Sequence, residues 1–178
     1  MDEAVIAKAT GIQNFKLVND LYALASAIPF LTDDDLFTVY PGSPTNGYGV
    51  KAVLAPGTGL GQGFLVPLGD GKFKVIPSEG SHADFAPVDD LQIDMMKFMK
   101  AEYGRVSVER IASGLGLRGI YKFLKETGIA TPSAEFLEAI ETEDLAAMIS
   151  KFALEGKDEL AVLALEIFIR VLGAQAGN

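Results

Sequence analysis

The feature that most constrains the fold is a change in composition and in the spacing of apolar residues near residue 88. Residues 1–88 hold most of the prolines and glycines and contain short β-rich runs, whereas residues 89–178 place apolar residues at helical spacing. Strands confined to one half and helices to the other are typical of an α/β or α+β-like domain. We therefore predict a mixed sheet followed by a helical half.

The same patterns predict the individual elements. Strands are expected over 15–18, 50–54, 63–68 and 72–76, with a hairpin turn at residues 69–71. Helices are expected over 2–9, 20–28, 89–103, from 107, over 115–127, from 132, over 143–154 and from about 158. Gly11, Pro29, Gly104 and Gly128 are expected to end the helices that precede them.

Composition excludes several classes of protein. The formal net charge is −9, and the 15 basic residues form no cluster of the kind that nucleic acids or anionic membrane surfaces require. The chain has no Cys, which excludes disulfides, thiolate zinc sites and Cys nucleophiles. The acidic start lacks the layout of a signal peptide. The apolar stretch 160–176 contains Glu166 and Arg170, so we expect a buried helix instead of a membrane span, and a cytoplasmic protein.

The first candidate site is the pair Asn19 and Asp20, directly after the short apolar run 15–18. In open α/β sheets, ligands bind at the carboxyl ends of strands, where an Asp can act as a general base and an Asn can hold a hydroxyl group. Asn and Asp are also preferred residues for capping the helix that follows. Taken alone, the pair favours the capping interpretation.

The second candidate is the glycine loop, Gly57-Thr58-Gly59, between two predicted strands. Glycines let a backbone turn tightly and bring its N–H groups against an anion, and Thr58 adds a hydroxyl donor. No Lys follows, so the loop is not a Walker motif, and a strand follows where a dinucleotide-binding fingerprint needs a helix. The same residues are also consistent with a glycine-rich hairpin that binds no ligand.

Two further segments carry polar residues. Glu79 and His82, the only His, lie in a loop after a predicted strand, and Glu109 lies in the first turn of a predicted helix. Glu79 and His82 can bind sugar hydroxyl groups, or a metal if Asp84 or Glu109 supplies a third ligand. A solvated surface turn and a favourable helix-dipole position are the structural alternatives.

The order and wording of these segments resemble the bacterial glucokinase family, which belongs to the actin–hexokinase class of ATP-dependent kinases. LVNDLYALASAIP resembles the family's strand ending in Asn-Asp-Phe, and APGTGLG resembles its GxGTGLG loop. PSEGSHADFAP resembles PGEGGHVDFAP, and GRVSVERIASGLGL resembles GHVSxERVLSGPGL. The final LGAQAGN also fits, so the resemblance runs over essentially the whole chain. It implies a ribonuclease-H-like, actin–hexokinase ATPase lobe.

The resemblance also implies roles for individual residues. Asp20 would be the catalytic base of an ATP:glucose phosphotransferase that makes glucose 6-phosphate. The implied sugar ligands are Asn19, Asp20, Glu79, His82 and Glu109. Gly57, Thr58 and Gly59 would face the phosphates of Mg²⁺-bound ATP, and no metal ligated by this chain is implied. Ser78, Ser81 and Leu115 depart from the family's wording, and the two serines would strain the loop if it needed positive φ there.

The family's DxGGTN phosphate hairpin and its adenosine-binding segment have no counterpart in these 178 residues. The resemblance therefore assigns residues 1–30 to the end of a small lobe and residues 31–178 to a large sugar-binding lobe, incomplete at its carboxyl end. We expect such a polypeptide to have little kinase activity by itself. The alternatives are a non-catalytic sugar-binding or interaction module and a metal-dependent hydrolase using Glu79, His82 and Asp84. Exposed sheet edges would favour a homodimer.

Overall fold

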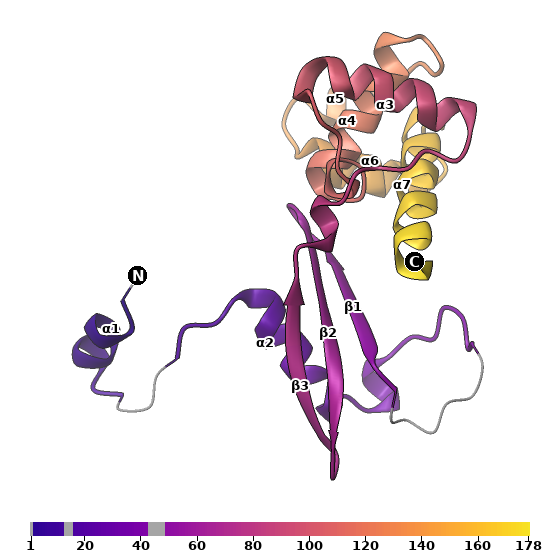
Figure 1. The fold of residues 1–178 in the computed structure, drawn as a ribbon. Helices are drawn as coiled ribbons and strands as arrows, with labels where there is room; N and C mark the ends of the chain where they lie inside the picture. The colour runs from indigo at the N-terminus through magenta and orange to yellow at the C-terminus, as the bar shows by residue number, and fades with distance from the viewer. Residues whose placement is uncertain (1, 13–15, 43–48) are drawn as a thin grey trace. The chain divides into compact units, whose positions relative to one another are not determined.

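The computed structural model describes residues 2–12, 16–42 and 49–178. The chain divides into two compact units (Figure 1). Unit 1 comprises Met1–Val53 and Gly63–Pro77, and unit 2 comprises Leu54–Gln62 and Ser78–Asn178. As the sequence predicted, strands lie in the first half of the chain and helices dominate the second.

The sheet has three strands in the order β1-β2-β3. The strands are β1 (Lys51–Pro56), β2 (Leu60–Gly69) and β3 (Lys72–Ser78). Short hairpin loops join them, so the described sheet is an antiparallel meander and not the mixed sheet that we expected. The predicted turn between β2 and β3 is confirmed, because Gly69, Asp70 and Gly71 all have positive φ.

The described residues of unit 1 also form four helical segments. These are α1 (Glu3–Thr10), α2 (Asp20–Ala27) and the short 3₁₀ helices η1 (Ile28–Phe30) and η2 (Asp33–Asp35). Ala25 of α2 packs with Val53 and Leu65 of the sheet to form the small core of this unit. Gly11 ends α1 with φ of 73°, as predicted.

The predicted strand over 15–18 is wrong for the residues that the structure describes, Lys16–Val18, while Phe15 lies outside them. A strand needs a neighbour for its backbone hydrogen bonds. The Leu17 N–H instead donates to the Glu3 carboxylate at 2.7 Å, and Lys16 lies over the Tyr22 ring. Residues 16–18 therefore belong to neither a strand nor a helix and lead directly into α2.

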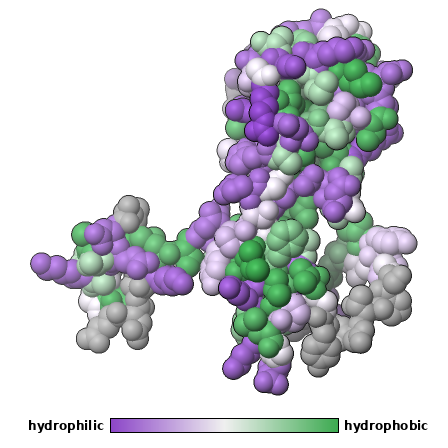
Figure 2. Space-filling view, in the orientation of Figure 1, coloured by the Kyte–Doolittle hydropathy of each residue, from purple (hydrophilic) through white to green (hydrophobic). Residues whose placement is uncertain are grey.

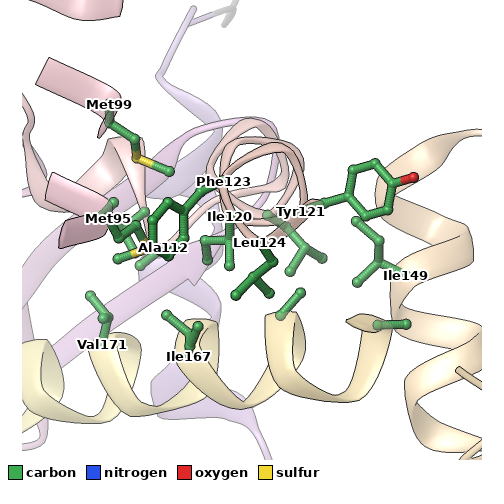
Figure 3. Close-up of a cluster of buried hydrophobic side chains, with 14 of the residues drawn as sticks. Met95, Met99, Ala112, Ile120, Tyr121, Phe123, Leu124, Ile149, Ile167 and Val171 are labelled. Carbon is green, nitrogen blue, oxygen red and sulfur yellow. The ribbon is translucent and has the colours of Figure 1, made fainter. Parts of the chain in front are cut away.

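Unit 2 is helical, with α4 at its centre in contact with α3, α6 and α7. Its elements are η3 (Gly80–His82), α3 (Asp90–Tyr103), η4 (Val108–Arg110), α4 (Gly114–Glu126), α5 (Ala134–Ala139), α6 (Leu145–Leu154) and α7 (Glu159–Gly177). Figure 3 shows Ile120, Phe123 and Leu124 of α4 among side chains from the neighbouring helices. All three are fully buried, so α4 organises this core.

Polar caps explain where these helices begin. Side chains at the N-caps accept a backbone N–H from the first turn of five helices, and these caps are Asp89, Ser113, Ser133, Asp144 and Asp158. The helix predicted from Ser107 is only the 3₁₀ turn η4. The reason is that Val106 and Val108 bond to the backbone of Phe85 and Ala83, which keeps the chain extended as far as Ser107. Only the short turn η4 then fits before Ser113 starts α4.

Among the described residues, α7 is the one helix long and apolar enough to cross a membrane by length and composition. Its apolar stripe packs into the core of unit 2 against α4 and α6. The stripe's buried members are Leu160, Ala161, Ala164, Ile167 and Val171. The prediction of a buried helix at this position is therefore confirmed for that face.

Candidate functional site

The glycine loop forms the tip of the β1–β2 hairpin. The Gly57 N–H donates to the Gly59 carbonyl at 2.8 Å, and the Gly57 carbonyl accepts the Gly114 N–H at 2.8 Å. Within the part of the chain that the structure describes, the N–H groups of Thr58 and Gly59 donate to no protein acceptor. Of the three residues predicted to face phosphates, Thr58 and Gly59 thus keep backbone donors for a ligand, and Gly57 does not.

The Glu79–His82 loop follows β3 directly. Its last three residues form η3, which presents His82 beside Glu79, with 3.5 Å between His82 Nε2 and Glu79 Oε2. Both side chains are more than half exposed. An exposed imidazole and carboxylate side by side offer the hydrogen-bonding groups that a sugar hydroxyl requires.

Backbone pairing brings Glu109 to the same place. Phe85 N–H donates to the Val106 carbonyl, and Val108 N–H donates to the Ala83 carbonyl, both at 3.0 Å. The turn η4 then places Glu109 Oε1 3.9 Å from His82 Nδ1. The imidazole therefore lies between two carboxylates, those of Glu79 and Glu109.

The other oxygen of Glu109 contacts the glycine loop. Glu109 Oε2 accepts the N–H of Leu60, the residue after Gly59, at 2.9 Å. A β-carbon on Gly59 would lie 2.5 Å from this oxygen. Unit 2 therefore brings the glycine loop, Glu79, His82 and Glu109 together, although these residues lie far apart in the sequence.

Two residues at this site were not singled out by the sequence. Arg105 donates to Asp84 Oδ1 at 2.6 Å and to the His82 carbonyl at 2.7 Å, which fixes the end of the loop. Gln62 is buried in β2, and its side-chain oxygen leaves no room for a β-carbon on Gly80. Arg105 lies two residues before Ser107 in a quoted motif, but nothing in that motif indicates its partners.

The metal-hydrolase alternative finds no support. Among the described residues, no three His, Cys, Asp or Glu side chains are grouped to hold a metal ion. Asp84, the predicted third ligand, is paired with Arg105.

Asn19 and Asp20 belong to unit 1, where they begin α2. Asn19 Oδ1 accepts the Leu21 N–H at 2.9 Å, and Asp20 Oδ1 accepts the same N–H at 2.8 Å. The capping interpretation is therefore confirmed. It uses the single side-chain oxygen of Asn19 and one of the two carboxylate oxygens of Asp20, and both residues are exposed.

The departures at Ser78 and Ser81 cause no backbone strain. Asp70 is the only residue other than glycine with positive φ in the described parts of the chain. Ser78 Oγ accepts the Gly80 N–H at 3.0 Å, which supports the loop. Leu115 is half exposed in the first turn of α4, so it also fits without conflict.

The sequence model of the glucokinase family matches residues 1–178. The chain belongs to the glucokinase family. Among curated glucokinases, that of Synechocystis sp. is 39% identical over 97% of this chain, and that of Nostoc sp. is 38% identical over the whole chain. These matches cover 52% and 55% of the relatives, so the chain spans about half the length of the curated glucokinases it matches.

Solved glucokinases share the fold. The structure of a glucokinase from an Antarctic psychrotroph aligns with 98% of this chain and 51% of its own, with a TM-score of 0.75 and 29% identity. A Balamuthia mandrillaris glucokinase, solved in complex with glucose, aligns with 76% of this chain at a TM-score of 0.61 and 27% identity. The predicted actin–hexokinase ATPase fold is confirmed by these neighbours.

Proposed function

We propose that this chain is the sugar-binding part of a kinase that transfers the γ-phosphoryl group of ATP to glucose. The observation that carries the proposal is the position of Glu109. Glu109 Oε2 accepts the N–H of Leu60, the residue at which the glycine loop ends and β2 begins. Glu109 Oε1 faces His82. One site thus combines backbone donors suited to phosphate with side chains suited to hydroxyl groups.

The charges favour a neutral, hydroxyl-rich ligand beside His82. Glu79 and Glu109 flank the imidazole, and two carboxylates repel an anion but accept hydrogen bonds from hydroxyl groups. Glucose or a similar hexose has this chemistry. Asn19 and Asp20 complete the proposed set of sugar ligands.

In the proposed site, the N–H groups of Thr58 and Gly59 bind the phosphates. A β-carbon on Gly57 would meet no atom within 4 Å, so a phosphate has room to approach the loop. The loop therefore fits the phosphates of ATP. Mg²⁺, bound with the nucleotide, would neutralise phosphate charge.

In the proposed reaction, the 6-hydroxyl oxygen of glucose forms a bond to the γ-phosphorus of ATP while the bond from that phosphorus to ADP breaks. Asp20 takes the hydroxyl proton. Glu79, His82 and Glu109 hold the sugar, and positioning of this kind supplies much of the catalysis in phosphoryl transfer.

Calorimetry with glucose tests the sugar site. We expect Glu79→Ala and His82→Ala each to weaken glucose binding about tenfold or more, because each removes hydrogen bonds to a polar ligand. Glu138→Ala, which removes an exposed carboxylate in α5, is the matched control and should bind as the unmodified chain does. Unchanged affinity in Glu79→Ala would contradict the proposal.

A coupled assay separates the kinase from a non-catalytic sugar-binding module. The DxGGTN hairpin implied by the resemblance is not in these 178 residues, so we expect the isolated polypeptide to bind glucose with little or no turnover. Turnover at the rate of a complete glucokinase would contradict this expectation.

We further propose a cytoplasmic homodimer. Strands β1 and β3 are the edges of the described sheet, and unpaired edges favour association. Figure 2 shows hydrophobic residues on the visible face of unit 1. Phe30, Phe37 and Tyr40 of this unit are exposed. Light scattering should give twice the mass of 18.9 kDa, and Phe37→Asp should lower it. A monomer at high concentration would rule the dimer out.

A further inference from the structure

We propose that Glu109 divides two tasks between its carboxylate oxygens. Oε2 holds the glycine loop in place, and Oε1 binds the sugar, so that sugar binding orders the loop that receives phosphate. Glu109 is then a positioning residue for the glycine loop as well as a ligand. The sugar half of this inference rests on the proposed function, whereas the positioning half does not.

A hydrogen bond from Leu60 holds one oxygen of the Glu109 carboxylate. Leu60 is the first residue of β2, and its N–H reaches Glu109 Oε2 across 49 positions of sequence at 2.9 Å. The Glu109 side chain is 28% exposed, and a hydrogen bond to a charged group away from bulk water is stronger than a neutral one. Oε2 therefore forms a hydrogen bond within the protein and is not the oxygen that we assign to the sugar.

Gly57 and Gly59 of the loop differ in the space that surrounds their α-carbons. A β-carbon on Gly59 would lie 2.5 Å from Glu109 Oε2, whereas one on Gly57 would meet nothing within 4 Å. Neither residue has positive φ. Turn geometry therefore does not require glycine at 59, but a side chain there would force the Glu109 carboxylate to move.

The segment 109–114 binds both ends of the glycine loop. Gly114 N–H donates to the Gly57 carbonyl, and Glu109 accepts from Leu60. Ser113 Oγ also donates to the Glu109 carbonyl at 2.7 Å, which joins the two attachment points. Thr58 and Gly59, with the donors suited to phosphate, lie between these points.

The remaining carboxylate oxygen of Glu109, Oε1, faces His82. Glu109 Oε1 lies 3.9 Å from His82 Nδ1, which is too long for a hydrogen bond. Oε1 can therefore accept a sugar hydroxyl beside the imidazole. A sugar bound there fixes the carboxylate whose other oxygen holds Leu60. By reciprocity, a phosphate that orders the loop must strengthen sugar binding by the same factor.

The variant Gly59→Ala tests the positioning task without any ligand. Its β-carbon displaces the Glu109 carboxylate, so we expect the Leu60 amide to exchange with solvent about tenfold faster or more, as measured by NMR. The resonances of His82, which are unique because the chain has one His, should also move. Gly57→Ala is the matched control and should change neither.

Two results would overturn the positioning role. One is unchanged Leu60 exchange in Gly59→Ala, and the other is an equal change in Gly57→Ala, which would indicate general stiffening of the loop. If Gly59→Ala fails to fold, Glu109→Ala and Glu109→Gln replace it. The alanine should lose the protection of Leu60, and the glutamine, which keeps an acceptor oxygen, should retain much of it. Protection that survives in Glu109→Ala would overturn the role.

Adding glucose to the unmodified chain tests the coupling. We expect the amide resonances of Thr58 and Gly59 to shift on binding, and the Thr58 response to disappear in Gly59→Ala. Binding seen by calorimetry without a shift at Thr58 would overturn the coupling. No glucose binding at all would contradict the proposed function instead, and the Leu60 exchange rates would still decide the positioning role.

Discussion

At the residue scale, the glycines of unit 2 differ in what surrounds them. Gly116 lies in the first turn of α4, and a β-carbon there would collide with the Ile111 carbonyl. Gly173 in α7 has open space around it. The two glycines therefore make opposite predictions for the same substitution.

We expect Gly116→Ala to lower the free energy of unfolding by about 1–3 kcal/mol, because α4 must shift to admit the methyl group. Gly173→Ala should raise it by about 0.4–1 kcal/mol, since alanine favours the helix. Denaturant unfolding of both variants measures these changes. A stability gain in Gly116→Ala would show that the close contact with Ile111 is absent.

At the element scale, an ion pair joins α3 to α4. Lys122 Nζ lies 2.7 Å from Glu102 Oε2. The hydrogen bond from Lys122 lowers the pKa of Glu102 from its usual 4.5, and the same bond raises the pKa of Lys122 from its usual 10.5. Folding thus favours the charged form of both groups.

The sign of the pH effect follows from these shifts. The Glu102 contribution is present above pH 4.5 and is lost as the pH falls through the lowered pKa in the folded state. The Lys122 contribution is present below pH 10.5 and is lost as the pH rises through its raised pKa. We expect Lys122→Met to make stability fall less steeply between pH 5 and pH 3, with a small effect because both groups are exposed. Lys97→Met, which breaks a pair within α3, is the control. An unchanged pH profile would contradict the assignment.

At the scale of the whole molecule, the two units have cores of very different size. Among the residues that the structure describes, the core of unit 1 has three buried hydrophobic residues, Ala25, Val53 and Leu65. The core of unit 2 combines buried residues from seven helices and strands. Local stability follows buried apolar contact. Unit 1 should therefore unfold before unit 2.

We expect heat to produce two transitions, with amides of β2 and β3 in unit 1 exchanging in the first. Leu65→Ala should destabilise only that transition, by about 2–5 kcal/mol, and Leu124→Ala only the second, by a similar amount. Both leucines are fully buried. Calorimetry and hydrogen exchange measure the effect, and a single transition lowered by both variants would show one cooperative unit.

Local signals in the sequence were sufficient for most elements. Apolar spacing and glycine stops located α1, α3, α4 and the three strands to within a few residues. They failed at 15–18 and at Ser107, where side-chain and long-range backbone bonds decide the conformation. Periodicity carries no information about such partners.

For the same reason, the sequence predicted several residues of the candidate site but not the hydrogen bonds that join them. The residue types of Glu79 and His82 indicated hydroxyl binding, and only the family resemblance added Glu109. Unit 2 brings the three together. The bond between Glu109 and Leu60 joins residues 49 positions apart and has no sequence signature. The lobe boundary at residue 30 and the roles of Asn19 and Asp20 stay predictions.

The contact between Gln62 and Gly80 limits how this family can vary. The Gln62 side-chain oxygen occupies the space that a β-carbon at position 80 would need, and the amide is buried. A mutation that adds a side chain at 80 therefore forces the Gln62 side chain to move. We expect homologues with a larger residue at 80 to carry Ala, Ser or Gly at 62, because a short side chain there removes the contact.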